Sequence, residues 1–236
     1  MGSAAGWLWG LIHPLVLLAS WTFVFQVCLK QTLPAGQPGN YPLFLFAGML
    51  PWLLFSEAVQ RSSSSLVEHS TLITKTVFPA EMVPLSVFLS SLVSHLMALV
   101  LLILAVEIWL RSLSPALALL PVYMLVLGLL AVGIGWIVAA LQVYLRDTSQ
   151  VLMIVLTFWF WLTPIFIFEN QFPRRLRVLL YANPLRYVVR AYRQVLLTPQ
   201  VPSLADFGVA AAYGVAAFVA GGLLFRYLKR GFADVL

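Results

Sequence analysis

The chain has 236 residues, of which 62% are hydrophobic and 9% are charged, and its formal net charge is +6. A soluble domain has roughly 45–50% apolar and about 25% charged residues, so this composition excludes a water-soluble globular protein. The basic residues are scattered between apolar runs, a single cysteine cannot form an intrachain disulfide, and no His/Cys/Asp/Glu cluster has metal-ligand spacing, so neither nucleic-acid binding nor a metal site is expected.

Six apolar stretches are each long enough, at roughly 20 residues, to cross a hydrocarbon core of about 30 Å. Backbone polar groups inside a bilayer must be paired within the protein, and the stretches lack the alternation of membrane strands, so we expect helices. No basic region precedes the first stretch, which is therefore not interpreted as a signal peptide. The predicted fold is an all-α integral membrane protein, a single permease domain over residues 1–236. Its spans cover about residues 7–29, 42–60, 83–110, 116–142, 151–168 and 207–227.

Six spans place both termini on one side of the membrane. If that side is the cytoplasm, the inner segments carry six basic residues and the outer segments eight, which opposes the positive-inside rule by a small margin. Six of the outer eight are arginines before the last span, and we expect them to belong to an amphipathic structure. Without them the count is six to two, which predicts cytoplasmic termini.

The segment between the second and third spans contains four consecutive serines, Ser62–Ser65, followed by Glu68. Serine side chains can cap the start of a helix, and the helix dipole favours a carboxylate in its first turns. The pattern predicts a short helix within residues 62–75 at the cytoplasmic membrane surface, with a polar loop as an equal alternative.

The segment before the last span, about residues 172–200, has an amphipathic pattern. Apolar residues between Leu185 and Leu196 recur at helical spacing, and Arg186, Arg190 and Arg193 lie together about a quarter turn away. Asn183-Pro184 separates this helix from a shorter one before it. We expect two short helices that dip into the outer leaflet or lie on it. The alternative is an interfacial hairpin anchored by arginine–phosphate contacts.

Four groups of motifs follow one another in a recognisable order along the chain. They are Gly6-Trp7-Leu8-Trp9 with His13-Pro14-Leu15 and Phe23-Val24-Phe25; Phe78-Pro79-Ala80-Glu81-Met82-Val83-Pro84-Leu85; Val143-Tyr144-Leu145-Arg146-Asp147; and Phe158-Trp159-Phe160-Trp161-Leu162-Thr163-Pro164-Ile165 with Tyr181-Ala182-Asn183-Pro184-Leu185 and Ala191-Tyr192-Arg193. This pattern resembles the permease subunit of type-two ABC transporters that export polysaccharides such as O-antigen, capsule and teichoic acid.

The resemblance implies a homodimer in the cytoplasmic (inner) membrane, with six spans per subunit and cytoplasmic termini. It also implies two copies of a separate ATP-binding cassette subunit, which bind ATP and Mg, and a lipid-linked glycan as substrate. No cofactor is expected in this chain, because it contains no phosphate-binding loop motif. The family usually has an amphipathic helix before the first span, whereas only Met1–Ala5 precede it here. Three explanations of this difference remain open: the chain is truncated, its start is assigned too late, or this member couples to the ATPase through the later loop alone.

By the same resemblance, residues 62–75 hold the helix that couples to the ATPase, and the two short helices before the last span form an outer gate. Replacing Leu66 or Leu72 by aspartate is predicted to uncouple ATP hydrolysis from export without unfolding the spans. Arg146-Asp147 is interpreted as a local ion pair and cap at a helix junction. The coupling candidates are Ser65, Leu66, Glu68, His69, Leu72, Ile73, Arg146 and Asp147, and the gate candidates are Asn183, Pro184, Arg186, Arg190 and Arg193.

A glycan path needs flat surfaces on which sugar faces slide, and aromatic rings provide them. Aromatic residues also form anchoring belts at both membrane interfaces, and this second interpretation is equally compatible with the sequence. The candidates for the path lining are Trp7, Trp9, Phe44, Trp52, Phe158, Trp159 and Trp161.

Three alternatives remain at this stage. The first is a type-two exporter of a drug or another small hydrophobic molecule. The second is an intramembrane enzyme acting on lipid or glycan, but no convincing pair of acidic residues or nucleophile–base constellation is seen. The third is a transporter driven by an ion gradient, which would require midplane charges or an internal repeat that is not evident.

Overall fold

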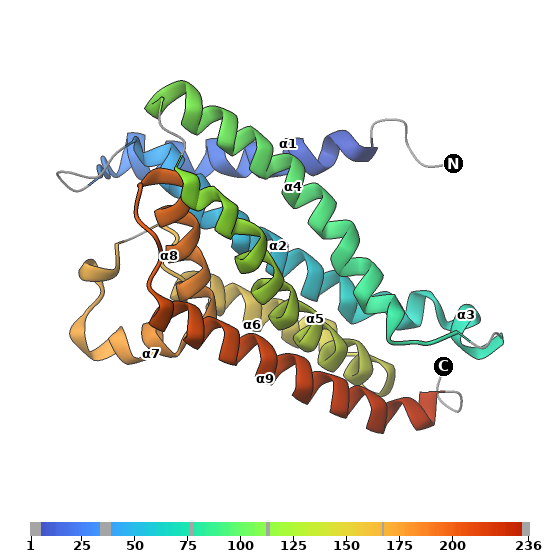
Figure 1. Cartoon of the computed structure of the whole chain (residues 1–236). Coiled ribbons are helices and arrows are strands. Elements are labelled where there is room, and N and C mark those ends of the chain that lie inside the picture. Colours follow the sequence, from blue (N-terminus) through green and yellow to red (C-terminus); the bar gives the residue numbers. More distant parts are fainter. Residues whose placement is uncertain (1–5, 34–38, 76–77, 112–113, 167, 233–236) are drawn as a thin grey trace.

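A computed structural model describes residues 6–33, 39–75, 78–111, 114–166 and 168–232, and all regular secondary structure among them is helical (Figure 1). The N-terminal half contains α1 (Gly6–Thr22), which continues into the π-helical segment η1 (Phe23–Cys28), then α2 (Tyr41–Glu68), α3 (Ser70–Lys75) and α4 (Met82–Leu110). The C-terminal half contains η2 (Pro115–Leu119), α5 (Leu120–Tyr144), α6 (Thr148–Leu162), η3 (Glu169–Gln171), η4 (Arg174–Leu176), α7 (Arg177–Ala182), α8 (Pro184–Leu197), α9 (Leu204–Leu228) and η5 (Lys229–Gly231).

Four helical stretches are long and apolar enough to cross a membrane: α2, α4, η2 with α5, and α9 with η5. The apolar stretches Ile12–Cys28 and Thr148–Leu162 are shorter. The predicted fifth span, 151–168, differs from the structure, because α6 starts at Thr148 and ends at Leu162. Thr163 is extended there, with ψ of 131°. The residue before a proline avoids the helical region, so Pro164 ends the helix at this point.

The long helices run alternately between two ends of the bundle (Figure 1). One end carries α3 and the C-terminal turn, and we call it the α3 end; there Lys229 Nζ lies 2.9 Å from Glu81 Oε2. The opposite end carries α7 and α8, and we call it the α8 end; there the Tyr41 hydroxyl donates a hydrogen bond to the Phe166 carbonyl at 2.9 Å. Helix α2 therefore runs from the α8 end to the α3 end, and α4 returns.

Helix α2 is the most buried of the four long apolar stretches. Asn40 caps its start by accepting a hydrogen bond from the Leu43 amide, and Pro42 occupies the first turn, where its missing N–H costs nothing. The helix continues without a break through Ser62–Ser65. Two of these serines donate to carbonyls of their own helix, Ser63 to Gln60 and Ser65 to Ser62. The prediction that the serines start a new helix is therefore wrong.

Helices α5 and α9 pack with their backbones almost in contact. A Cβ atom on Gly133 of α5 would lie 2.4 Å from the carbonyl carbon of Ala217, and one on Gly221 of α9 would lie 2.1 Å from the Gly133 carbonyl oxygen. Membrane helices lack a hydrophobic driving force toward each other, so small residues that permit close van der Waals contact are the usual basis of such pairs.

The α3 end is held together by Glu81, which precedes α4. Its carboxylate accepts two hydrogen bonds from Lys229 Nζ, at 3.0 and 2.9 Å, and its carbonyl accepts one from Trp136 Nε1 at 3.0 Å. Burial raises the pKa of Glu81, but the hydrogen bonds and the charges of Lys229 and Arg226 outweigh it, so the pKa lies below its ordinary value of 4.5.

Replacing Glu81 by glutamine is expected to lower stability at neutral pH by about 0.5–1 kcal/mol, as for other partly exposed ion pairs. A lowered folded-state pKa contributes stability above the ordinary carboxyl value, and this contribution is lost as the pH falls through the folded value. Thermal unfolding in detergent should therefore separate wild type from Glu81→Gln at pH 7 and by less at pH 3. An equal difference at both pH values would assign the effect to something other than the charge.

Candidate functional site

An aromatic groove lies between α1, α2 and α6. Its volume is about 360 Å³, and the rings of Trp21, Trp52 and Phe160 line it. The ring centroids of Trp52 and Phe160 are 5.4 Å apart, and those of Trp21 and Phe160 are 5.9 Å apart. Ser56, Gln60 and Thr157 add polar groups to this lining. Flat apolar faces beside a few hydroxyl and amide groups can hold an amphipathic ligand such as a sugar ring.

The seven predicted lining residues do not come together. Trp52 lines the aromatic groove, whereas Phe44 packs against Phe168 with centroids 4.6 Å apart and Trp159 packs against Phe55 at 5.1 Å. The side chains of Phe158 and Trp161 are 70% and 52% exposed on α6. Trp7 and Trp9 belong to α1, but their side chains lie outside the described part of the structure.

The sequence interpretation missed Trp21 and Phe160. Trp21 and Phe25, four residues apart and therefore on one face of the helix, both contact Phe166, with centroids 4.8 and 4.6 Å away. This i, i+4 aromatic pair was visible in the sequence. Its partner Phe166 follows the break at Pro164, and the sequence gives no sign that the chain turns back there.

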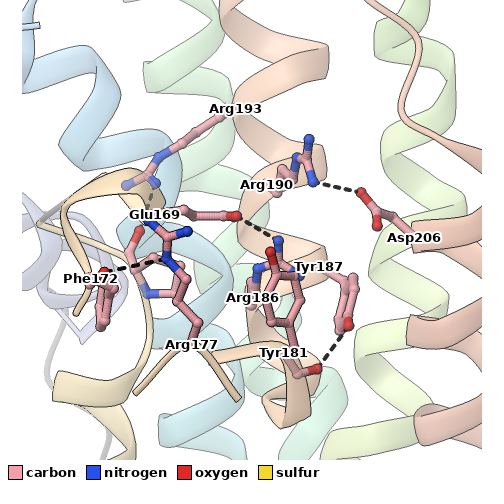
Figure 2. A network of polar contacts seen from close by, with 10 residues as sticks. Glu169, Phe172, Arg177, Tyr181, Arg186, Tyr187, Arg190, Arg193 and Asp206 are labelled. Carbon is pink, nitrogen blue, oxygen red and sulfur yellow. Dashed lines mark hydrogen bonds and ion pairs between the residues drawn. The ribbon is translucent and has the colours of Figure 1, made fainter. Parts of the chain in front are cut away.

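Polar contacts connect α8 to the segments on both sides of it (Figure 2). Arg186 donates from Nη2 to Glu169 Oε2 at 2.6 Å, and its guanidinium lies 4.2 Å from the centroid of the Tyr181 ring. Arg190 Nη1 lies 3.1 Å from Asp206 Oδ2 on α9. The two arginines therefore attach α8 to the residues after α6 and to the last helix.

Arg193 points into the protein. Its Nε donates to the carbonyl of Phe44 at 3.2 Å, Nη1 to that of Pro164 at 2.6 Å and Nη2 to that of Ile165 at 2.5 Å. The guanidinium also lies 3.5 Å from the centroid of the Phe44 ring. The position is possible because Gly48 has no side chain: a Cβ atom there would overlap Arg193 Nη2. Arg193 therefore joins α8 to the start of α2 and to the chain that follows α6.

These contacts overturn the view of α8 as a helix on a membrane surface. Most of α8 is buried, including Arg186, and Arg190 is the exposed arginine of the three. An interfacial hairpin held by arginine–phosphate contacts is excluded for Arg186 and Arg193, whose partners are protein groups. The arginines share a stripe in the sequence pattern, but their partners come from distant parts of the chain, which the helical period does not reveal.

Asn183 forms a joint between α6 and α8. Its Oδ1 accepts hydrogen bonds from Trp159 Nε1 at 2.8 Å and from the Leu185 amide at 3.0 Å. Its Nδ2 donates to Thr163 Oγ1 at 3.0 Å and to the Leu162 carbonyl at 3.3 Å. Asn183 thus caps the start of α8, beside Pro184, and holds the end of α6 at the same time.

At the α3 end, the predicted coupling residues separate into two groups. Ser65 and Leu66 are buried, and Leu66 packs in a second apolar core with Phe225 and Phe232. An aspartate at Leu66 would place a charge in that core, so we now expect unfolding at this position and not uncoupling alone. Ile73 is half-buried against the same core.

An exposed face remains at the junction of α2 and α3. Glu68 and His69 are exposed there, and Leu72 is 38% exposed. Val67, which the sequence interpretation did not select, is 47% exposed beside them. We call these four residues the junction face.

Arg146 and Asp147 are exposed between α5 and α6. The salt bridges found among the described residues do not include this pair, and the Asp147 side chain does not cap α6. Gln142 closes the turn instead, donating to the Arg146 carbonyl at 2.8 Å and accepting from the Ser149 amide at 2.7 Å. The predicted ion pair and cap are therefore not formed.

Comparison with known proteins gives one consistent assignment. Residues 2–197 match the family model of the ABC-2 type transporter. The chain is 27% identical over 237 aligned residues to the O-antigen export system permease protein RfbA of Myxococcus xanthus, covering 99% of this chain and 88% of that protein. Two RfbA permease proteins of Klebsiella pneumoniae are 26% and 25% identical, with the same coverage.

Proposed function

Since this chain belongs to the ABC-2 type transporter family, we propose that it is the transmembrane subunit of an exporter that moves a lipid-linked polysaccharide of the O-antigen type across the cytoplasmic membrane. The observation that carries this proposal is end-to-end similarity to O-antigen export permeases from two organisms. The aromatic groove supports it, because rings beside hydroxyl and amide groups suit a sugar chain.

The subunit crosses the membrane six times, with both termini in the cytoplasm and the α3 end on the cytoplasmic side. The alternating course of α1 with η1, α2, α4, α5, α6 and α9 supports six crossings. Arg186, Arg190 and Arg193 bind protein groups at the α8 end. They are therefore left out when basic residues on the two sides of the membrane are counted for the positive-inside rule. Two subunits form a homodimer, which would cover the exposed aromatic face of α6 at Phe158 and Trp161.

Energy comes from two copies of an ATP-binding cassette subunit that bind ATP and Mg. The cassette subunits dock on the junction face and on Arg146 and Asp147. The joint at Asn183 transmits movement of α6 to α7 and α8, which form the outer gate. This route has a physical basis: α6 begins at the exposed turn after Asp147 and ends at the side chain of Asn183.

The test is co-expression with the ATP-binding subunit encoded beside this chain, followed by purification of the pair and assay of ATPase. Stable co-purification and stimulation by a lipid-linked glycan are expected. Stimulation by a small hydrophobic molecule and not by glycan would replace the polysaccharide exporter with a drug exporter. A chain that binds no ATPase would remove the exporter proposal.

Replacing Leu72 by aspartate is expected to lower glycan-stimulated ATPase and co-purification about tenfold, because a charge at a hydrophobic contact costs at least about 1.4 kcal/mol of binding. Leu72 is exposed, so the isolated subunit should keep its thermal stability. The matched control is Val201→Asp, at a 70% exposed position in the non-helical segment between α8 and α9, away from the junction face. Unchanged pairing in Leu72→Asp would remove the junction face as the docking site.

A further inference from the structure

A second groove opens between α1, α2 and α4, and it shares Leu53, Ser56 and Gln60 of α2 with the aromatic one. It has a volume of about 710 Å³. Two charged side chains line it, Glu57 and Arg61, whose Oε1 and Nη1 atoms are 3.0 Å apart on one face of α2. Ser91 of α4 bonds to both, at 3.2 Å to Glu57 Oε1 and 3.4 Å to Arg61 Nη1. Charged groups within membrane helices are costly, and they usually mark a site of function.

The groove is polar at one end and apolar at the other. On α2, which runs toward the α3 end, the lining changes from Leu50, Leu53 and Leu54 to Ser56, Glu57, Gln60 and Arg61. On α4, which runs the opposite way, Ser90, Ser91 and Ser94 come before Met97 and Ala98; Val93 lies among the serines and His95 at the transition. Both helices therefore place their polar groups toward the α3 end and their apolar groups toward the middle of the bundle.

An exposed apolar stripe on α4 runs beside the groove. Its members recur at three- and four-residue spacing, as on one face of a helix. They are Leu89, Val93, Leu96, Val100 and Leu104, each 43% exposed or more. In a bilayer this stripe faces acyl chains, so the groove is open to lipid along its length.

We propose that this groove binds one phospholipid with a zwitterionic, ammonium-bearing headgroup, such as phosphatidylethanolamine, from the leaflet at the α3 end. Glu57 and Arg61 carry one charge of each sign, so the pair adds no net charge that would attract an anionic lipid. The phosphate binds Arg61 and the serine hydroxyls, and the ammonium donates to Glu57. The hydrogen bonds found for Arg61 use Nη1 alone, which leaves Nε and Nη2 for the phosphate. The acyl chains follow the apolar stripe. Such a lipid site is independent of the exporter's cargo.

The test is native mass spectrometry of the full chain after equilibration with an equimolar mixture of phosphatidylethanolamine, phosphatidylcholine and phosphatidylglycerol. One retained phosphatidylethanolamine is expected, about tenfold above the other two, because the quaternary ammonium of phosphatidylcholine cannot donate to Glu57 and phosphatidylglycerol has no ammonium. Equal retention, or preference for phosphatidylglycerol, would overturn the proposal.

Variants locate the site and separate binding from folding. Glu57→Gln leaves Arg61 unpaired and should shift the preference to phosphatidylglycerol, a change of selectivity that partial unfolding would not produce. Ser94→Leu fills the groove and leaves both charges in place, so it should reduce retention of all three lipids. Glu81→Gln is the matched control, because it breaks an ion pair outside the groove, and its lipid preference should equal that of wild type. Wild-type preference in Glu57→Gln, together with wild-type retention in Ser94→Leu, would show that the lipid binds elsewhere.

Discussion

Replacing Gly133 by valine is expected to prevent assembly of the folded bundle. The first added carbon would lie 2.4 Å from the carbonyl carbon and oxygen of Ala217, both backbone atoms of α9. No rotamer change relieves an overlap with backbone, so the two helices must separate along their whole contact. Overpacking of a core costs about 1–3 kcal/mol when side chains can adjust, and we expect more here.

The measurement is the yield of monodisperse protein on size exclusion and its thermal unfolding in detergent. Gly208→Val is the matched control: it makes the same substitution within α9, where no atom lies within 4 Å of the added carbon. It should behave as wild type. Gly221→Ala, which meets the Gly133 carbonyl from the other helix, should repeat the loss. A Gly133→Val protein as stable as Gly208→Val would mean that α5 and α9 are not in close contact.

Replacing Arg193 by methionine should cost about 3–5 kcal/mol and stop export. The substitution keeps much of the aliphatic volume but removes the donors to the carbonyls of Pro164 and Ile165, which lie outside any helix. A charge-assisted hydrogen bond contributes about 1.5–3 kcal/mol, and a buried acceptor left without a donor adds a desolvation cost. The cation–π contact with Phe44 is lost as well.

Arg190→Met is the control for this variant, because Arg190 is exposed and its pair with Asp206 should contribute only about 1 kcal/mol or less. Arg193→Lys should recover part of the loss, since an ammonium donates hydrogen bonds but cannot reach three carbonyls as the planar guanidinium does. Both properties should be measured, unfolding in detergent and glycan export in cells. Equal stability of Arg193→Met and Arg190→Met would contradict the inward position of Arg193.

Hydrophobic length predicted the helices well where a helix is apolar throughout, as in α4 and α9. It failed where tertiary partners decide the structure. Ser62–Ser65 have the composition of a cap, yet they continue α2: the hydroxyls of Ser63 and Ser65 bond to carbonyls of the same helix, and Ser62, Ser63 and Ser65 are buried. The arginines of α8 have the period of a surface helix, yet Arg186 bonds inward to Glu169, and Arg193 bonds inward to the carbonyls of Pro164 and Ile165.

The lining of the candidate site also depends on tertiary contacts that the sequence does not reveal. Of the aromatic candidates, Trp52 lies in the groove, and the groove also takes Trp21 from α1 and Phe160 from α6. Which rings share a groove depends on how three helices rotate relative to one another, and their apolar faces are too uniform to fix that rotation from sequence. The glycines of α5 and α9 were visible in the sequence, but their pairing was not.

The sequence Asn183-Pro184 also has a chemical consequence. Asparagine ages in proteins when the backbone nitrogen of the following residue attacks its side-chain carbonyl, which releases ammonia and closes a five-membered imide. Proline has no N–H, so its nitrogen cannot form this ring in the usual way. An aspartate at position 183 would lack the donor that holds Thr163 and the Leu162 carbonyl. The proline that starts α8 therefore also protects the joint from deamidation by this route.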